Sequence, residues 1–395
     1  MDKLALFGGK PVRDTKIYYG RQTIEDDDIK VVAEALTADL ITCGPKISEF
    51  ERELCEYTGA KHAVVVTSGT AALHCACMAA GIKDGDEVIT TPITFAASAN
   101  CARYCGADVV FADVRYDTMN IDPKSIEEKI TDKTRAVVAV DFTGQAVEID
   151  AIREICDRHG LTFIEDAAHS IGTKYNGHEI GSLADMTTFS FHPVKTITGG
   201  EGGAILTNSD ELYEKLKLVR THSITHEGVD KAANGFWYYE QLGLGYNYRL
   251  TDFQAALLIN QLGKIDRFIK RRKEIAEAYD RAFADMPEII PHTIIPESDT
   301  SYHLYVLRLN TEKLSCDRQQ FFDALSAENI QPQVHYIPVY WLKYYQDLGY
   351  KKGLCPVAEK VYSEILSIPI YPLMTDEDVC DVIKAVRKVV DYYRQ

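Results

Sequence analysis

The sequence predicts an α/β protein, with a large domain built on a mostly parallel sheet and a smaller C-terminal α+β domain. From 47 to 208, helical patterns alternate with short strands rich in Val, Ile and Ala, which is typical of a sheet covered by helices on both faces. A proline-marked break at 287–296 separates this pattern from a second set of strands and helices. The 395 residues, 46% of them hydrophobic, are enough for two or three domains.

The expected elements follow in chain order. An N-terminal arm (1–16) precedes a helix at 25–36 that carries acidic residues in its first turn. The large domain (17–250) is expected to hold strands at 63–66, 87–90, 109–112, 136–140 and 162–165, followed by a polar, aromatic loop at 221–245. One long connecting helix (251–286) comes next, and its basic residues at 264–273 are expected to be solvated. The small domain (287–395) is expected to contain strands at 302–309 and 331–334, a helix at 318–328 and two closing helices.

Composition and charge argue against several classes of protein. The net charge of -16 disfavours a general nucleic-acid binder, because phosphate backbones are bound mainly by Lys and Arg. We find no opening apolar run behind a basic segment and no apolar stretch of about 18 residues, so we expect neither secretion nor a membrane span. The ten cysteines are not spaced as zinc ligands. We therefore expect no metal site, and free, buried thiols in a reducing cytoplasm.

One lysine has an unusual setting. Lys195 lies between two apolar, β-prone runs (187–191 and 204–207) and is followed by four glycines between 199 and 203. A lysine on a turn between packed strands is partly desolvated, which lowers its pKa and makes the neutral amine available to form an imine with an aldehyde. A lysine taken alone is more often a solvated loop residue. The interpretation therefore depends on the residues around it.

A phosphate-binding turn is predicted upstream of this lysine. Pyridoxal phosphate, the aldehyde cofactor that such an amine binds, needs a helix N-terminus for its phosphate group. The short strand at 62–67 ends at Ser68, Gly69 and Thr70, and a helix of small residues begins at Ala71. These four residues are the candidates for the phosphate site.

Two further polar residues fit the cofactor ring. The pyridine nitrogen needs a carboxylate, and the phenolic oxygen needs a hydrogen-bond donor. Asp166 and His169 follow the strand at 161–165, and open α/β sheets bind their ligands at such carboxyl ends. Asp166 is also suited to cap the following helix, and the two roles are compatible.

Several longer motifs identify a family. The segments TSGTAAL, PITFAASAN, EDAAHS, FSFHPVKTITGGEGG and GYNYRLTDFQAAL occur in this order, and the chain from Ile17 onward resembles the DegT/DnrJ/EryC1/StrS sugar aminotransferases. This resemblance implies a fold-type I pyridoxal-phosphate-dependent transferase with a seven-stranded sheet. Within the family, YYGRQTIEDDDI, LITCGPKISEFE and QVHYIPVY resemble the enzymes of pseudaminic acid synthesis that aminate a UDP-4-keto-6-deoxy sugar.

The resemblance assigns roles to individual residues. It implies that Phe95 stacks on the cofactor ring, that Ser190 contacts the phosphate, and that Asn247 reaches the cofactor phosphate of a second subunit. An obligate homodimer with two shared sites follows. The substrate pocket is implied to include Tyr19, Leu40, Ile41, Thr42, His335, Tyr336, Ile337 and Pro338. Tyr19 is equally compatible with an arm residue packed on a partner subunit.

Four positions near these motifs carry separate expectations. His169 stands where many relatives have glutamine, Gly199 where threonine is common, and Ile337 where some relatives have lysine. Because this chain has Ile337 in place of that lysine, a charge contact to the sugar nucleotide at this position is in doubt. His192, which strand alternation places on the same face as Ser190, is interpreted as a structural histidine.

The implied reaction is a transamination. Lys195 would bind the cofactor and act as the base, Asp166 would keep the pyridine nitrogen protonated, and L-glutamate would donate the amino group. The implied acceptor is UDP-2-acetamido-2,6-dideoxy-β-L-arabino-hex-4-ulose. Alternatives are another nucleotide-sugar 4-aminotransferase (bacillosamine, legionaminic or perosamine type) and a non-catalytic pyridoxal-phosphate-binding sensor. A dehydratase of this fold carries histidine in place of the lysine, and Lys195 argues against it.

Overall fold

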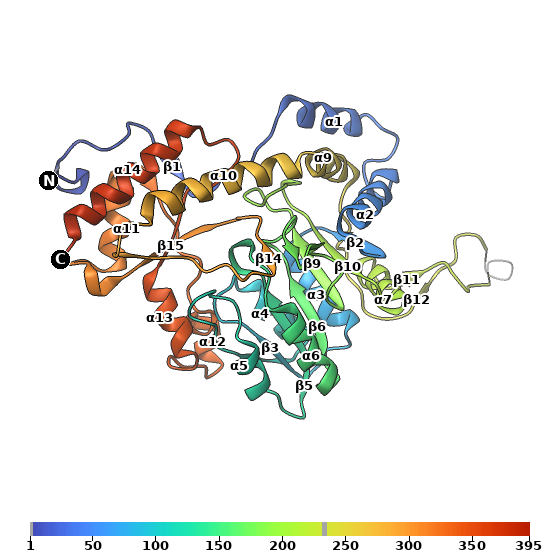
Figure 1. Cartoon of the computed structure of the whole chain (residues 1–395). Helices are drawn as coiled ribbons and strands as arrows, with labels where there is room; N and C mark the ends of the chain where they lie inside the picture. Colours follow the sequence, from blue (N-terminus) through green and yellow to red (C-terminus); the bar gives the residue numbers. More distant parts are fainter. Residues whose placement is uncertain (1–2, 231–234) are drawn as a thin grey trace.

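A computed structural model of the chain describes residues 3–230 and 235–395, and its centre is a seven-stranded sheet (Figure 1). The strand order is β2 (His62–Val66), β10 (Gly203–Thr207), β9 (Met186–Ser190), β6 (Thr162–Asp166), β5 (Thr134–Val140), β3 (Glu87–Thr90) and β4 (Asp108–Phe111). Only β10 runs antiparallel to its neighbours, so the expected mostly parallel sheet is confirmed. The carboxyl ends of the parallel strands therefore meet at one edge.

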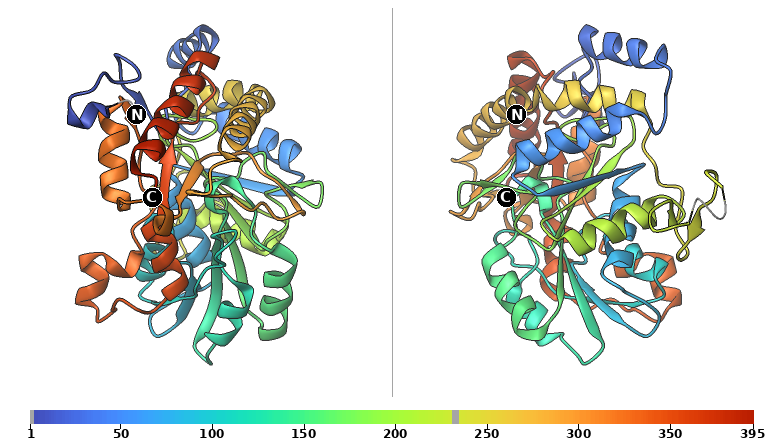
Figure 2. Two further views of the ribbon diagram at one scale, coloured as in Figure 1. Left: turned by 60° about the vertical axis from the view of Figure 1, so that its left-hand side comes forward. Right: turned by 90° about the vertical axis from the view of Figure 1, so that its right-hand side faces the viewer.

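Helices cover both faces of this sheet, as Figure 2 shows. Along β2, Val64 and Val66 pack into one core cluster while Ala63 and Val65 pack into the other, because successive side chains point to opposite faces. The first face is covered by α3 (Gly69–Ala79), α4 (Ala97–Tyr104), α7 (Asp210–Arg220) and α13 (Pro356–Glu364). The second face is covered by α2 (Pro45–Thr58), α5 (Pro123–Glu128), α6 (Ile149–His159) and α9 (Asp252–Leu262).

The connecting segment is two helices, so the expected single long helix is wrong. After α9, Lys264 N donates to the carbonyl of Gln261, three residues back, and α10 (Ile265–Phe283) starts anew. Gly263 disfavours a continuous helix. The Lys264 ammonium is held by three carboxylates at the start of α1 (Asp26–Leu36), at 3.1 Å from Glu25, 2.6 Å from Asp27 and 3.0 Å from Asp28. The expectation that the basic residues at 264–273 are solvated also fails for Arg272, which is 1% exposed.

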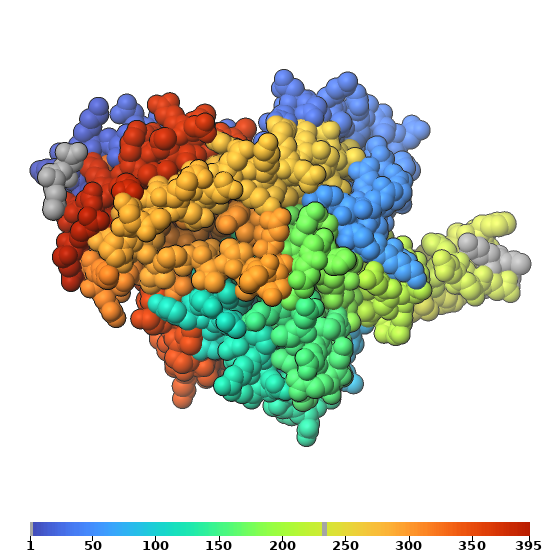
Figure 3. Space-filling model, viewed as in Figure 1, coloured from blue at the N-terminus to red at the C-terminus, as the bar shows by residue number. Residues whose placement is uncertain are grey.

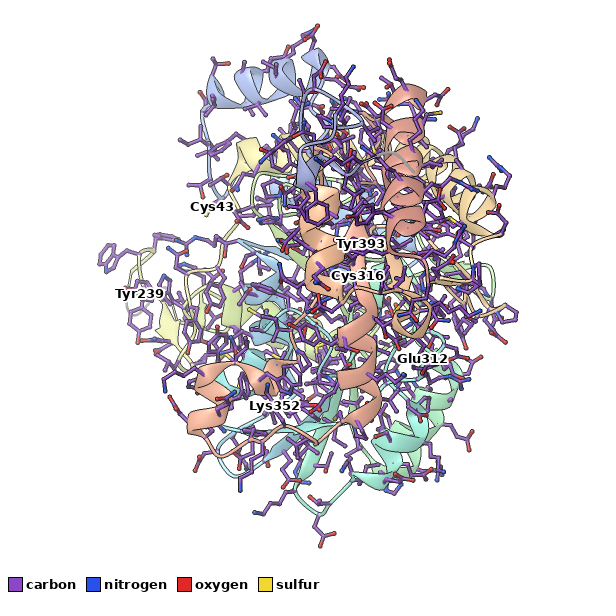
Figure 4. The ribbon with its side chains drawn as sticks, turned by 90° about the vertical axis from the view of Figure 1, so that its left-hand side faces the viewer. Cys43, Tyr239, Glu312, Cys316, Lys352 and Tyr393 are labelled. Carbon is purple, nitrogen blue, oxygen red and sulfur yellow. The ribbon has the colours of Figure 1, made fainter. Side chains whose placement is uncertain are left out.

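The C-terminal part of the chain has its own core. A three-stranded sheet of β13 (Ile289–Ile290), β15 (Tyr305–Leu309) and β17 (Ile365–Ile368) packs against α10, α11 (Arg318–Ala327) and α14 (Asp376–Tyr393). Cys316 and Tyr393 lie close together where the end of α14 meets this core (Figure 4), and Ser315 N donates to the Tyr393 carbonyl at 2.7 Å. The described residues include α12 (Lys343–Asp347), α13 and α14, so three closing helices replace the two expected.

The N-terminal arm folds back onto the C-terminal core. The buried carboxylate of Glu328 accepts hydrogen bonds from the backbone amides of Ala5 and Val12, both at 2.9 Å. β1 (Ile17–Tyr18) then pairs in parallel with β16 (Ile330–Gln331), a two-residue strand where a longer one was expected. Short elements complete the described fold: η1 (Ala5–Phe7), η2 (Phe142–Gly144), η3 (Thr311–Lys313), η4 (Val339–Trp341), and a small sheet of β14 (Ser298–Asp299), β7 (Lys174–Tyr175) and β8 (His178–Glu179).

The segment expected as a substrate loop projects from the body of the protein (Figure 3). Its base is a short hairpin of β11 (Ile224–Thr225) and β12 (Glu240–Gln241). Phe236 is 90% exposed and Trp237 80% exposed, and Figure 4 shows Tyr239 at the outer edge of the molecule. Residues 231–234 of this predicted loop lie outside the described residues.

Two expectations concern the cysteines and membrane spans. All ten cysteines are free, but Cys43 and Cys380 are exposed and Cys55 and Cys105 only half-buried, so the expectation of buried thiols holds for six of them. Within residues 3–230 and 235–395, the structure has no helix with the length and apolar character needed to cross a membrane.

Candidate active site

Lys195 lies on the turn that links β9 to β10, at the edge of the sheet where β6 ends. Its backbone amide donates to the carbonyl of His192 at 2.9 Å, which closes the turn and fixes the lysine close to the sheet. Burial lowers the pKa of Lys195 to about 8, and the negative charge of Asp166 opposes part of that decrease. A neutral amine is therefore available near physiological pH.

Asp166 ends β6 and is 4% exposed. The Ser98 hydroxyl donates to its Oδ2 at 2.6 Å, and the Ala168 amide donates to its Oδ1 at 3.2 Å. Burial raises the pKa of Asp166, while these two hydrogen bonds and the positive charge of Lys195 act in the opposite direction. A buried carboxylate with two donors is stabilised as an anion when a further cation lies beside it.

A turn and a helix N-terminus lie where the phosphate site is predicted, but α3 begins at Gly69, two residues before the expected start at Ala71. Ser68 caps α3, and its hydroxyl accepts the Ala71 amide at 3.1 Å. The amides of Gly69 and Thr70 belong to the first helical turn, which has no intrahelical acceptor for them. A Cβ on Gly69 would lie only 2.7 Å from the Cβ of Ser190 on β9, so the turn and Ser190 are in direct contact. This places two backbone donors, and the Ser190 hydroxyl, at one helix N-terminus.

A cluster of aromatic rings and imidazoles lies beside Lys195 and Asp166. The ring of His169 packs on His303 with centroids 4.4 Å apart, and His169 Nε2 lies 3.2 Å from the Tyr336 hydroxyl. Tyr19 packs edge-on against His335 at 4.8 Å. Burial lowers the pKa of His169 and of His303 well below the ordinary value, and nearby positive charge adds to the effect. Both imidazoles are therefore neutral at pH 7.

Phe95 lies at the mouth of this cluster. It follows β3 and is 63% exposed, although its ring centroid is only 6.3 Å from that of Tyr336. The Val339 amide donates to the carbonyl of Pro92, which joins the segment carrying Tyr336 to the segment carrying Phe95. An exposed aromatic face beside polar groups is suited to stacking on a flat ligand.

Other predicted residues lie apart from this cluster in the chain described. The Ile41 carbonyl accepts the Asp252 amide at 3.0 Å, and Thr42 pairs with Thr251, so this segment lies on α9. Leu40 is 53% exposed on the same surface. Among the described residues, none of the hydrogen bonds or ring contacts links residues 40–42 to Lys195. The assignment of residues 40–42 to the substrate pocket stays a prediction.

Asn247 also points away from its own chain core. Its neighbours Tyr246 and Tyr248 pack on His74, with ring centroids at 4.9 and 6.0 Å, so the intervening asparagine faces outward and is exposed. Thr221 is its backbone partner in an isolated bridge.

The remaining positions of the predicted substrate segment differ in exposure. Ile337 is 45% exposed, whereas Pro338 is buried and its carbonyl accepts the Trp341 amide at 2.7 Å. His192 is exposed and makes no side-chain hydrogen bond within the described part of the chain, so its interpretation as a structural histidine is wrong. The reason is that β9 ends at Ser190, and the chain turns before His192 can pack.

Three residues at the site were not predicted from the sequence. Ser98 bonds to Asp166, His303 packs on His169, and the buried guanidinium of Arg272 donates to the His303 carbonyl at 3.1 Å. Ser98 had a detectable signal, because it lies one helical turn beyond Phe95. The other two contacts join segments 134 and 31 residues apart, and no local pattern marks them.

These residues fit pyridoxal phosphate. An amine with a lowered pKa, a buried carboxylate and two backbone donors at a helix N-terminus match its aldehyde, its ring nitrogen and its phosphate. In addition, His169 Nδ1 is buried and has no hydrogen-bond partner in the described chain. A buried polar atom without a protein partner indicates a group that the polypeptide does not supply.

Comparisons with known proteins agree with this geometry. A model of the DegT/DnrJ/EryC1/StrS aminotransferase family matches residues 22–387. The spore coat polysaccharide biosynthesis protein SpsC of Bacillus subtilis is 43% identical over 375 residues, which are 94% of this chain and 96% of SpsC. The UDP-4-amino-4,6-dideoxy-N-acetyl-β-L-altrosamine transaminase of Campylobacter jejuni is 40% identical over 365 residues, 92% and 94% of the two chains.

A solved structure shows the same fold. Helicobacter pylori PseC, an aminotransferase involved in the biosynthesis of pseudoaminic acid, superimposes with a TM-score of 0.89 at 34% identity and covers 96% of this chain and 100% of its own. The site geometry, the family match and these relatives lead to one conclusion. The chain belongs to the DegT/DnrJ/EryC1/StrS aminotransferase family and is a pyridoxal-phosphate-dependent sugar aminotransferase.

Proposed function

We propose that this enzyme transfers the amino group of L-glutamate to UDP-2-acetamido-2,6-dideoxy-β-L-arabino-hex-4-ulose, in pseudaminic acid biosynthesis. The observation that carries the substrate assignment is the 40% identity, over almost the whole chain, to a relative named for the aminated altrosamine product. The placement of Lys195 beside Asp166 supports the chemistry.

The roles of the two central residues follow from their environments. When bound, pyridoxal phosphate supplies an electron sink that lets an amino group leave one substrate and enter another. Lys195, whose pKa of about 8 makes the neutral amine more accessible at pH 7 than that of an ordinary lysine, takes the proton from the α-carbon of glutamate and later returns a proton to the sugar carbon. Asp166, held by Ser98, carries the negative charge that keeps the ring nitrogen protonated. Release of 2-oxoglutarate before the sugar binds implies ping-pong kinetics.

Residues around the mouth are proposed to bind the sugar. Tyr19, His335 and Tyr336 form one contiguous aromatic surface, since His335 packs edge-on against both tyrosines at 4.8 Å. The Nδ1 atom of His335 lies 2.8 Å from the Ser367 hydroxyl, and this contact fixes the imidazole. Ile337, 45% exposed, adds an apolar contact where some relatives have a charge. Pro338 holds this segment in place through its buried ring.

A homodimer with two shared sites completes the proposal. Leu40 lines an open groove of about 550 Å³ between α1, α2 and α9, and Leu242 and Leu244 are 64% and 76% exposed. Apolar surface of this kind usually marks an interface. We therefore assign residues 40–42, the 221–245 loop and Asn247 to the active site of a second copy. Light scattering that gives a monomer at assay concentration would contradict this assignment.

Product analysis tests the substrate assignment. The pyridoxal-phosphate-loaded protein is given L-glutamate and each of the two UDP-4-keto-6-deoxy-N-acetylhexosamine epimers, and the products are identified by mass spectrometry and stereochemical analysis. We expect amination of the L-arabino epimer alone. Preference for the D-xylo epimer would overturn the pseudaminic acid assignment and favour a bacillosamine or legionaminic type enzyme. The 43% identity to SpsC, a polysaccharide biosynthesis protein, is the observation that keeps this second candidate.

Two simpler measurements test the remaining parts. Glutamate should shift the visible absorption band of the loaded protein, and a band that stays unchanged would favour a non-catalytic sensor.

We also propose a cytoplasmic location, which the ten free cysteines support. Cell fractionation that places the protein outside the cytoplasm would contradict it.

A further inference from the structure

Tyr336 and His169 are joined by a hydrogen bond in the candidate active site. Tyr336 Oη lies 3.2 Å from His169 Nε2. In residues 3–230 and 235–395 this is the one hydrogen bond made by either side chain. Tyr336 comes from the extended segment before η4, and His169 from the turn after β6. The contact therefore joins the predicted substrate segment to the predicted cofactor residues.

The second ring nitrogen of His169 has no hydrogen-bond partner among the described residues. Its Nδ1 is buried and lacks a partner in the described chain. His303 packs on the same imidazole, but the two rings are tilted by 44° and no hydrogen bond joins them, and His303 Nδ1 is likewise buried without a partner in the described chain. Buried ring nitrogens are nearly always hydrogen-bonded. The Nδ1 atom therefore needs a partner that comes from outside the polypeptide.

The chemistry of that partner fixes the proton on the imidazole. His169 is neutral, so one ring nitrogen carries hydrogen and the other accepts a hydrogen bond. The phenolic oxygen of pyridoxal phosphate is an acceptor when it is ionised, and it can pair only with a protonated Nδ1. Nε2 must then be the acceptor, and the Tyr336 hydroxyl must be the donor.

We infer that Tyr336 is a positioning residue: it donates to His169 Nε2 and so holds His169 in the tautomer whose Nδ1–H binds the phenolic oxygen of the cofactor. The inference rests on the proposed function only through the placement of His169 beside that oxygen. It also accounts for a feature of the sequence. A glutamine, which many relatives carry at this position, offers an amide donor without a choice of tautomer, whereas a histidine needs a neighbour that selects one.

The inferred hydrogen bond has a spectroscopic consequence. A donor to the phenolic oxygen stabilises the negative charge on that oxygen. The oxygen then stabilises less well the proton on the nitrogen that joins Lys195 to the cofactor, so the pKa of this nitrogen falls. Loss of Tyr336 should raise that pKa by about half a unit to one unit, which is the size of one neutral hydrogen bond. The titratable groups that contact His169 or act on its charge are Lys195, His303, His335 and Tyr336, and Asp166 acts on Tyr336. To attribute the pKa change to Tyr336, the test therefore uses a variant that alters Tyr336 and leaves the other groups in place.

Absorption titrations provide that test without any sugar substrate. The visible band of the loaded protein is titrated in wild type, Tyr336→Phe and Tyr340→Phe. Tyr340 is a matched control, because it is buried on the next turn of the chain but its hydroxyl donates to Glu359, at 2.8 Å. We expect a raised pKa in Tyr336→Phe alone. Equal shifts in both variants, or no shift in either, would overturn the inference.

A double-mutant cycle shows whether Tyr336 acts through His169. In a His169→Leu background, Tyr336→Phe should leave the pKa of the band unchanged, because there is no imidazole to position. A shift of the same size as in the wild-type background would overturn the inference.

The tautomer itself is observable in the unaltered protein. With ¹⁵N-labelled histidine, the His169 resonances are assigned by their absence in His169→Leu, and we expect a protonated Nδ1 and an unprotonated Nε2. A protonated Nε2 would overturn the inference even if Tyr336→Phe fails to fold. Cofactor that stays covalently attached to Lys195→Ala after borohydride reduction and denaturation would instead overturn the assignment of the cofactor site.

Discussion

The low pKa of Lys195 has a stability cost that can be measured without any substrate. Lys195 has a pKa of about 8 in the folded chain and an ordinary value of 10.5. The difference, 10.5 minus 8, corresponds to about 3 kcal/mol of unfavourable free energy for the charged amine, at about 1.4 kcal/mol per pKa unit. The side chain keeps some contact with solvent, so we expect between about 1 and 3 kcal/mol. The attraction of Asp166 is already included in that pKa.

The cost depends on pH in a defined direction. Below pH 8 the amine is protonated in both the folded and the unfolded chain, so the full cost applies. Between pH 8 and 10.5 the folded chain has released this proton while the unfolded chain retains it, so stability rises with pH through this window. Lys195→Met removes the cost. The cofactor-free variant should therefore be more stable than cofactor-free wild type at pH 7, and its advantage should fall to less than half at pH 9.5.

Urea unfolding at pH 7 and pH 9.5, at one protein concentration, measures both quantities. Lys264→Met is a matched control of opposite sign. Burial lowers the pKa of Lys264, but hydrogen bonds to three carboxylates within 3.1 Å, and their charge, raise it by more. Removal of this ammonium should destabilise the protein. If Lys195→Met is less stable than wild type at pH 7, or if its advantage does not change with pH, the reasoning about a desolvated amine is wrong.

Three further predictions concern catalysis and cofactor binding. Lys195→Ala should abolish turnover while the circular dichroism spectrum stays that of the folded protein, and full activity would contradict its role. Asp166→Asn should reduce kcat/KM more than His169→Asn, because the first residue controls the charge of the ring nitrogen and the second only contacts the phenolic oxygen; equal rates would reverse that ranking. Gly69→Ala should raise the cofactor dissociation constant by about tenfold or more, because a methyl group there would lie 2.7 Å from a side-chain carbon of β9. Unchanged affinity in a fluorescence titration would show that the turn does not hold the phosphate.

The strands and the cofactor turn could be predicted because their signals are local. Alternation of strands and helices depends on residues two to four positions apart, and it placed Asp166 at the end of β6. Ser68 was predictable for the same reason, since a small polar residue between a strand and a helix is a common cap. The break between α9 and α10 was missed although Gly263 is a local signal, because the hydrophobic pattern continues across it. In this case the contacts of Lys264 with α1, more than 230 residues earlier in the chain, stabilise the break.

The pairing within the site was not predictable, because it depends on contacts between distant segments. Tyr336 and His169 are 167 residues apart in sequence, and nothing near either residue specifies the other. The sequence identified both as candidates, one for the sugar and one for the cofactor. Their hydrogen bond shows that a residue of the proposed sugar pocket also contacts a cofactor residue. We therefore expect changes at this position of the proposed sugar pocket to alter the proposed cofactor site as well.

Arg272 holds in place two segments of the site, the one that carries His303 and the one that carries Tyr19. Its buried guanidinium donates to the carbonyls of Tyr302, His303 and Ile370, at 3.3, 3.1 and 2.9 Å. The amide of Ile370 in turn donates to the carbonyl of Tyr19. Burial lowers the pKa of Arg272 to about 10, so it remains charged at pH 7, and three carbonyl dipoles offset its loss of hydration. One cation on α10 thus fixes both the histidine that packs on His169 and the tyrosine at the mouth, so the helix expected to be a solvated connector is part of the support of the active site.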